Sequence, residues 1–200
     1  MPRLNRVLFV ASLSVFGCAE QPKSAPEVPV RVAKAIDVEI VPGTPGSSAR
    51  TEPYEASVGG FKFTVPADWQ QQQPKSDVLL GEFTVPGEEG AARLTLSSAG
   101  GGTEANLERW RGQFSRGPND PEPRQSDITF DGQKGTLIEL SGTFTDMFSG
   151  GRPSKNWQML GVAVPLGPIN FFIKLTGPQA TVSAQKDAFI KFVESAKADK

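Results

Sequence analysis

The 200-residue chain contains no histidine and a single cysteine, Cys18. The absence of histidine excludes catalysis by Ser-His-Asp or Cys-His groups, the usual His/Cys zinc sites and HExxH metalloproteases. One cysteine cannot form a disulfide within the chain. We therefore expect no metal and no cofactor. Carboxylate, lysine or hydroxyl chemistry, and a hard cation held by carboxylates alone, stay open.

The chain also lacks an apolar run of about 20 residues, the length with which a helix crosses a bilayer. The apolar stretch Val7–Phe16 follows two arginines and ends at Gly17, as in a bacterial export signal. The sequence predicts a lipoprotein signal peptide over residues 1–17 and a lipid on Cys18, where two or more acyl chains would give stable anchoring. Phe16 stands where a lipobox has a small residue, so an ordinary secretory signal with an incidental cysteine is the alternative.

These features predict a cell-envelope protein, lipid-anchored to a bacterial membrane, with its domain in the periplasm or at the cell surface. Removal of residues 1–17 takes two of the 21 basic residues and none of the 22 acidic ones, which leaves a net charge of about −3. Nothing in this balance favours nucleic acid. The expected partners are the membrane, through the lipid on Cys18, and another envelope protein.

Residues 18–58 are predicted to be a Pro/Gly-rich tether, because proline interrupts the hydrogen bonding of helices and sheets. The prolines of this segment are Pro22, Pro26, Pro29, Pro42, Pro45 and Pro53. Val30–Val41 is rich in β-branched residues, and a short strand there is an alternative.

The remaining residues, 59–200, have the size of one folded domain. Apolar residues in alternating or continuous runs, bounded by Pro and Gly, predict seven strands. They are Phe61–Val65, Val78–Val85, Ala91–Ser97, Ile128–Phe130, Gly135–Thr145, Trp157–Val164 and Asn170–Thr176. Asp131-Gly132 between two of them is a strong hairpin signal.

Two helices interrupt the strands. Thr103 is the expected N-cap of the first, in which Leu107, Trp110 and Phe114 form one apolar stripe. The second is expected over Gln179–Lys197. A helix with one apolar stripe must pack on a sheet, so the predicted fold class is α+β, with a mostly antiparallel sheet of about six or seven strands.

Three segments carry a resemblance to known proteins: Gly60–Trp69, Gly101–Phe114 and Leu175–Pro178 with the Phe-rich helix after it. The match covers about Gly59–Ala196 and resembles uncharacterised bacterial lipoproteins that are similar to the PsbP/Mog1-like α/β/α sandwich. The resemblance implies helices on both faces of the sheet. Known members of that wider fold are photosystem accessory proteins and nuclear-transport factors, which bind partners, and neither role carries over to these residues.

Three short patterns could indicate catalysis or phosphate binding. Ser183 and Lys186 have S-x-x-K spacing, Gly100–Gly102 precedes a helix, and Glu88 and Glu89 form a carboxylate pair. None of these three patterns is accompanied by the other residues that its class of enzyme or phosphate site requires. An exposed helix face, a flexible turn and a solvated hairpin tip are the favoured interpretations, and we expect no enzymatic activity.

The chain's three tryptophans, Trp69, Trp110 and Trp157, are its largest apolar side chains and could line a ligand pocket. The alternative is a core position for each of them.

A second candidate site is the stretch Asp146–Lys155, which separates two predicted strands and is longer than a usual hairpin loop. Met147, Phe148 and Arg152 have interface composition and are predicted to contact a partner. The alternative is that Phe148 folds back onto the edge of the core.

Together these expectations describe a non-catalytic cell-envelope lipoprotein that binds a protein or a small ligand. A structural or assembly-support lipoprotein, and a hydrolase using carboxylate or Ser/Lys chemistry, are the alternatives.

Overall fold

A computed structural model describes residues 50–146 and 150–199 of the chain. These residues belong to one compact unit. The predicted signal peptide, Cys18 and the interval Val30–Val41 lie outside the described residues.

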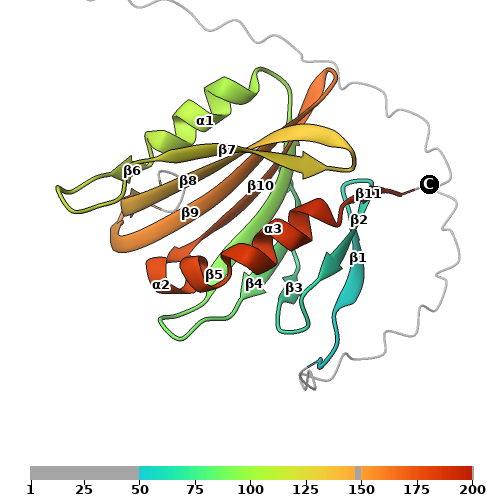
Figure 1. Ribbon diagram of the computed structural model, residues 1–200, viewed down its shortest axis with the longest axis horizontal. Coiled ribbons are helices and arrows are strands. Elements are labelled where there is room, and N and C mark those ends of the chain that lie inside the picture. Colours follow the sequence, from blue (N-terminus) through green and yellow to red (C-terminus); the bar gives the residue numbers. More distant parts are fainter. Residues whose placement is uncertain (1–49, 147–149, 200) are drawn as a thin grey trace, which may run out of the picture. The chain divides into compact units, whose positions relative to one another are not determined.

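The described residues form eleven strands and three helices (Figure 1). The strands are β1 (Tyr54–Val58), β2 (Phe61–Val65), β3 (Gln70–Gln72), β4 (Leu79–Val85), β5 (Ala92–Ala99), β6 (Phe114–Ser115), β7 (Arg124–Phe130), β8 (Gln133–Thr145), β9 (Pro153–Leu166), β10 (Ile169–Pro178) and β11 (Lys197–Ala198). The helices are α1 (Thr103–Arg111), α2 (Gln179–Ala184) and α3 (Lys186–Glu194).

Every strand pairing is antiparallel, and the strands form two sheets. The larger sheet has eight strands in the order β3-β4-β5-β10-β9-β8-β6, with β7 paired to β8 off this path. The smaller sheet has the order β1-β2-β11. The fold class is therefore α+β with mostly antiparallel sheets, as predicted.

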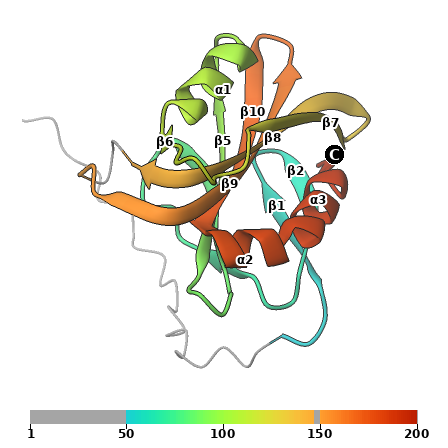
Figure 2. The same ribbon diagram turned by 60° about the vertical axis from the view of Figure 1, so that its left-hand side comes forward.

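Side chains along the central strands alternate between two hydrophobic clusters, because successive residues of a strand point to opposite faces. In β9, Leu160 and Val162 belong to a cluster that includes side chains of α3, whereas Met159 and Ala163 belong to a cluster that includes side chains of α1. Figure 2 shows strands of the larger sheet passing between α1 and the α2–α3 pair.

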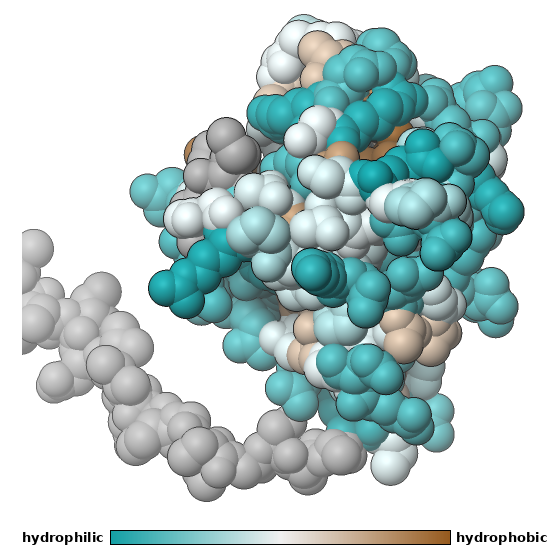
Figure 3. Space-filling model, turned by 90° about the vertical axis from the view of Figure 1, so that its left-hand side faces the viewer, coloured by the Kyte–Doolittle hydropathy of each residue, from teal (hydrophilic) through white to brown (hydrophobic). Residues whose placement is uncertain are grey.

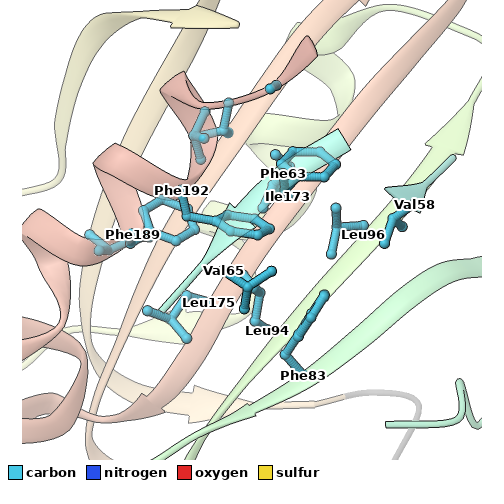
Figure 4. Close-up of a cluster of buried hydrophobic side chains, with 14 of the residues drawn as sticks. Val58, Phe63, Val65, Phe83, Leu94, Leu96, Ile173, Leu175, Phe189 and Phe192 are labelled. Carbon is cyan, nitrogen blue, oxygen red and sulfur yellow. The ribbon is translucent and has the colours of Figure 1, made fainter. Parts of the chain in front are cut away.

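The α3 cluster is the larger of the two and joins the helix to both sheets. Phe189 and Phe192 of α3 point toward Phe63 and Val65 of β2 and the leucines of β5 (Figure 4). Phe63 and Phe192 stack with ring centroids 4.7 Å apart. This packing fixes β2 and α3 on one face of the larger sheet.

The α1 cluster is smaller and depends on a close approach of helix to strand. Leu107 and Trp110 of α1 are buried there. The indole of Trp110 lies directly over Gly161 of β9, since a Cβ on Gly161 would be 2.5 Å from Trp110 Cζ3. A residue without a side chain at this position therefore allows α1 to dock.

The number of strands differs from the six or seven expected. The four strands that the sequence did not indicate, β1, β3, β6 and β11, have between two and five residues. The predicted tether over residues 18–58 is also wrong at its end, because Tyr54–Val58 is a strand paired with β2. Gly59 and Gly60, with φ of 61° and 84°, make the tight turn between them.

The closing helix is not continuous over Gln179–Lys197 but changes to a second helix at Gln185. The amide side chain of Gln185 links this junction to the strands: Oε1 accepts a hydrogen bond from Trp69 Nε1 at 3.1 Å and Nε2 donates one to the Pro86 carbonyl at 3.2 Å. Thr103 is the first residue of α1, and the N-cap position belongs to Gly102.

Candidate functional site

Polar residues alternate with leucine and isoleucine in two neighbouring strands of the larger sheet. In the pairing of β5 with β10, Arg93 lies opposite Thr176 and Thr95 lies opposite Lys174. Lys174 and Thr176 share the face of β10 with Phe172, which packs under α1. The four polar residues therefore form a group on the α1 face of the sheet.

This group lines a cavity of about 320 Å³. The other described lining residues come from β8, β9 and the ends of the segment that joins them: Phe144, Asp146, Arg152, Ser154 and Trp157. The rings of Phe144 and Trp157 stack with centroids 5.5 Å apart and planes 2° from parallel. The cavity thus combines an aromatic wall with several cationic and hydroxyl groups, and its volume is in the range of small-molecule sites.

Arg93 is held at the cavity by a buried carboxylate. Glu82 of β4 is 4% exposed, and its two oxygens accept hydrogen bonds from Arg93 Nε at 2.8 Å and Nη2 at 3.0 Å. Oε2 also accepts from the Lys75 backbone N–H at 3.3 Å. The hydrogen bonds from Arg93 keep the pKa of Glu82 below its usual value, against the opposing effect of burial. The Arg93 charge is therefore largely neutralised by its own partner.

Lys174 has no such partner. Its Nζ makes no hydrogen bond or ion pair with the described residues, and burial lowers the pKa of this ammonium group below its usual value. Asp146 opposes the shift in pKa, whereas the charges of Arg93 and Arg109 add to it. A partly buried cation without an ion pair costs stability, so its position suggests a role in binding.

Thr176 is a second unsatisfied group in the cavity. It is 6% exposed, and its hydroxyl has no hydrogen-bond partner among the described residues. Buried polar atoms are nearly always hydrogen-bonded, and an orphaned one calls for an explanation. A ligand in the cavity would supply the missing partner.

Comparison with known proteins identifies the fold. No protein-family model and no curated protein sequence matches the chain. The solution structure of cyanobacterial PsbP (CyanoP) from Synechocystis sp. PCC 6803 superposes with a TM-score of 0.50 and 13% identity, covering 78% of this chain and 98% of that one. The described domain has a PsbP/Mog1-like fold. At this identity the likeness concerns the fold and not the function.

Two further solved structures are more weakly similar. LpqN of Mycobacterium tuberculosis, involved in cell envelope biogenesis, gives a TM-score of 0.43 with 17% identity, covering 72% of this chain and 88% of that one. A protein of unknown function from Pseudomonas aeruginosa, PA94, gives 0.42 with 15% identity, covering 72% and 95%. At these TM-scores neither likeness adds to what is inferred for the PsbP/Mog1-like domain.

The three tryptophans do not line one pocket. Trp69 is 1% exposed in the α3 cluster, and Trp110 is 4% exposed beneath α1. Trp157 is only partly buried and forms part of the cavity wall. Trp69 also borders a separate hollow beside Gln70–Gln72, so of the three tryptophans Trp157 is the one that lines the cavity with Arg93 and Lys174.

Of the predicted partner-contact residues, Met147 and Phe148 lie outside the described residues. Arg152 is exposed and lines the cavity, as Trp157 does. The expected ten-residue loop is shorter, because β9 already begins at Pro153, which pairs with Thr145 of β8. A proline is compatible with the first residue of a strand.

The catalytic patterns are not assembled in the described residues. Ser183 Oγ donates a hydrogen bond to Gln158 Oε1 at 2.6 Å, and Lys186 Nζ pairs with Glu139 Oε1 at 2.7 Å, so the two side chains are engaged separately. Glu88 and Glu89 are exposed at the turn between β4 and β5. The Gly101 carbonyl accepts a hydrogen bond from Asn170 Nδ2, and Gly100 and Gly101 form a bend ahead of α1.

Residues 50–146 and 150–199 contain neither a metal-binding cluster nor a membrane-spanning helix. No group of three or more Asp, Glu or Cys side chains in these ranges is arranged to hold a metal ion. None of the helices in the same ranges has the length and apolar character of a membrane span.

Sequence reasoning missed Arg93, Thr95, Lys174 and Thr176. The available signal was two polar residues, spaced two apart, in each of two strongly apolar strands. That spacing ordinarily indicates a solvent-exposed face of a sheet. The four residues form one group only because β5 pairs with β10.

Proposed function

We propose that this protein is a non-catalytic binding module of the bacterial cell envelope, anchored by a lipid on Cys18, whose PsbP/Mog1-like domain binds an envelope protein or a small ligand. The observation that carries the proposal is the cavity of Arg93, Lys174, Thr176 and Trp157, which joins unsatisfied polar groups to an aromatic wall. Sites of this composition are typical of ligand recognition.

The hydrogen bonding of the described residues supports binding over catalysis. A Ser/Lys hydrolase needs its hydroxyl within hydrogen-bond reach of the amine. Ser183 and Lys186 each have another partner, and no described hydroxyl is hydrogen-bonded to Lys174 Nζ. The complete lack of histidine removes the commonest general base from the whole chain.

The anchor part of the proposal is tested on the mature protein by mass spectrometry of its N-terminal peptide. The expected peptide begins at Cys18 and carries acyl groups on this residue. A free Cys18 thiol, or cleavage at another bond, would remove the anchor from the proposal and leave the binding module.

The binding part is tested by affinity purification from detergent extracts of native membranes. The wild-type protein is expected to recover a partner or a co-purifying small molecule that Trp157→Ala loses, because the indole forms part of the cavity wall. Lys134→Met is the control, since Lys134 is exposed and pairs with Asp127 on the β7–β8 hairpin. Identical recovery with wild type and with a folded Trp157→Ala variant would favour a structural or assembly-support role.

A further inference from the structure

We propose that the cavity binds a small organic anion that joins one carboxylate to a flat apolar body, with the carboxylate at Lys174 and Thr176 and the body against Trp157. This inference rests on the proposed function and specifies its ligand class.

The charge balance of the cavity favours an anionic ligand. Arg93, Arg152 and Lys174 supply three positive charges, and Asp146 with the Arg93 partner Glu82 supplies two negative ones. Among these groups the balance is one positive charge, and the charge of Arg109, which also acts on Lys174, adds to it. An anionic ligand would compensate this excess positive charge.

The contacts of the three cations show which of them is available to the ligand. The Glu82 carboxylate holds Arg93 with two hydrogen bonds. Arg152 is exposed, so solvent and salt screen its charge. Lys174 is the partly buried cation without an ion pair to the described residues, and it shares one face of β10 with the orphaned Thr176 hydroxyl. A carboxylate accepts hydrogen bonds at both oxygens and so can take one from each group.

The apolar part of the ligand follows from the aromatic wall. Phe144 is 6% exposed, so the partly buried indole of Trp157, stacked on it, is the ring available to a ligand. Flat apolar groups pack favourably on such a ring. The face seen in Figure 3 is mainly hydrophilic, with hydrophobic residues only in small separate areas, so it shows no broad apolar patch.

The test is calorimetric titration of the chain from residue 18 onward with Cys18→Ser, so that neither lipid nor detergent competes for the probes. The probes are 2-naphthoate, its neutral amide 2-naphthamide, and inorganic phosphate. We expect 2-naphthoate to bind about tenfold more tightly than 2-naphthamide, the effect of one charged hydrogen bond, and more tightly than phosphate.

Variants separate the two halves of the site. Lys174→Met is expected to weaken 2-naphthoate binding about tenfold while leaving 2-naphthamide unchanged. Lys174→Arg should keep most of the affinity for 2-naphthoate, and Trp157→Ala should weaken both probes alike. Lys134→Met is the matched control, because it removes an exposed lysine about 30 Å along β8 from Phe144 and should change nothing.

Three results would overturn the inference: equal affinity for 2-naphthoate and 2-naphthamide, unchanged 2-naphthoate affinity in a folded Lys174→Met variant, or no 2-naphthoate binding at concentrations on the order of 1 mM. Tighter binding of phosphate would replace the carboxylate by a phosphate ligand. If one of these results is obtained while partner recovery still depends on Trp157, the proposed ligand class is refuted and the proposed binding module is retained.

Discussion

Lys174 and Thr176 lie two residues apart in a strand whose intervening residue, Leu175, is fully buried. A core strand normally pairs or excludes such polar groups, and both of these lack hydrogen-bond partners for their side chains among the described residues. Proteins commonly give up stability where a site must receive a ligand. The two unpaired side chains therefore cost folding stability, as is typical of residues in a binding site and not of residues that only support the fold.

The first prediction concerns Lys174→Met, which keeps the length of the side chain and removes its charge. The variant should be more stable than wild type at pH 7 by about 1 kcal/mol, because no buried charge remains to be desolvated. For a domain of this size the melting temperature should rise by about 2–4 °C. Thermal unfolding measures the change, and Lys134→Met should lie within about 0.5 kcal/mol of wild type.

The pH dependence of this difference has a defined sign. Burial places the folded-state pKa of Lys174 below its usual value of 10.5. Between the two pKa values the folded protein binds fewer protons than the unfolded chain, so this group makes stability rise with pH there. The advantage of Lys174→Met should shrink as pH approaches 10.5. An advantage that grew with pH would contradict the assignment.

Glu82→Gln is predicted to have the opposite effect at neutral pH. It removes a buried, charge-assisted pair of hydrogen bonds and should cost about 1–3 kcal/mol in the free energy of unfolding. Because the pKa of Glu82 is lowered in the folded state, its stabilisation is fully present above the ordinary value of 4.5 and is lost as pH falls through the folded-state pKa. Urea unfolding at several pH values should show the gap to wild type closing below about pH 4.5.

Glu88→Gln provides the control for that experiment. Glu88 is exposed at the tip of the β4–β5 hairpin, and its replacement should change stability by less than about 0.5 kcal/mol. An equal loss in both variants would mean that net charge, and not the Glu82–Arg93 pair, governs acid stability.

Among the elements, the contact between α1 and β9 is sensitive to a single substitution. Gly161→Ala would put a methyl group within 3 Å of the Trp110 ring and 3.1 Å from Ile138 Cγ2. We expect a loss of about 1–3 kcal/mol from overpacking and an increase in acrylamide quenching of Trp110 as α1 loosens. Gly100→Ala is the control, because its Cβ would lie 3.9 Å from the nearest heavy atom. Wild-type quenching and stability in Gly161→Ala would show that α1 can shift at little cost.

The elements also show what local sequence could predict. All seven expected strands exist, and the Asp131-Gly132 turn joins β7 to β8, with φ of 45° and 75° at the two residues. These strands are long or strongly patterned. The two-residue strands β6 and β11 are too short for a period of two to be visible, and Gln70–Gln72 has no apolar residue at all. They form because neighbouring strands offer free hydrogen-bonding groups, which is a tertiary effect.

At the scale of the whole molecule, the cavity could not be predicted because it depends on the order of the strands. Arg93 and Thr176 are 83 residues apart in sequence and lie opposite each other in the sheet. Trp157 and Arg152 were each marked by the sequence, but as parts of two different hypotheses, and the structure places both at one cavity. Local patterns specify which face a residue occupies, and chain topology decides what lies beside it.

The last prediction follows from the composition of the whole chain and concerns metal. With no histidine and one cysteine in the sequence, a metal would have to be bound by oxygen ligands. The described residues contain no group of three Asp, Glu or Cys side chains suited to this. Folding should then need no bound cation, and EDTA should leave the melting temperature of the full chain unchanged. A fall of more than about 5 °C would correspond to a stabilisation above about 1 kcal/mol from a bound cation. Restoration of the melting temperature by Ca²⁺ or Mg²⁺ after such a fall would establish an oxygen-ligand site.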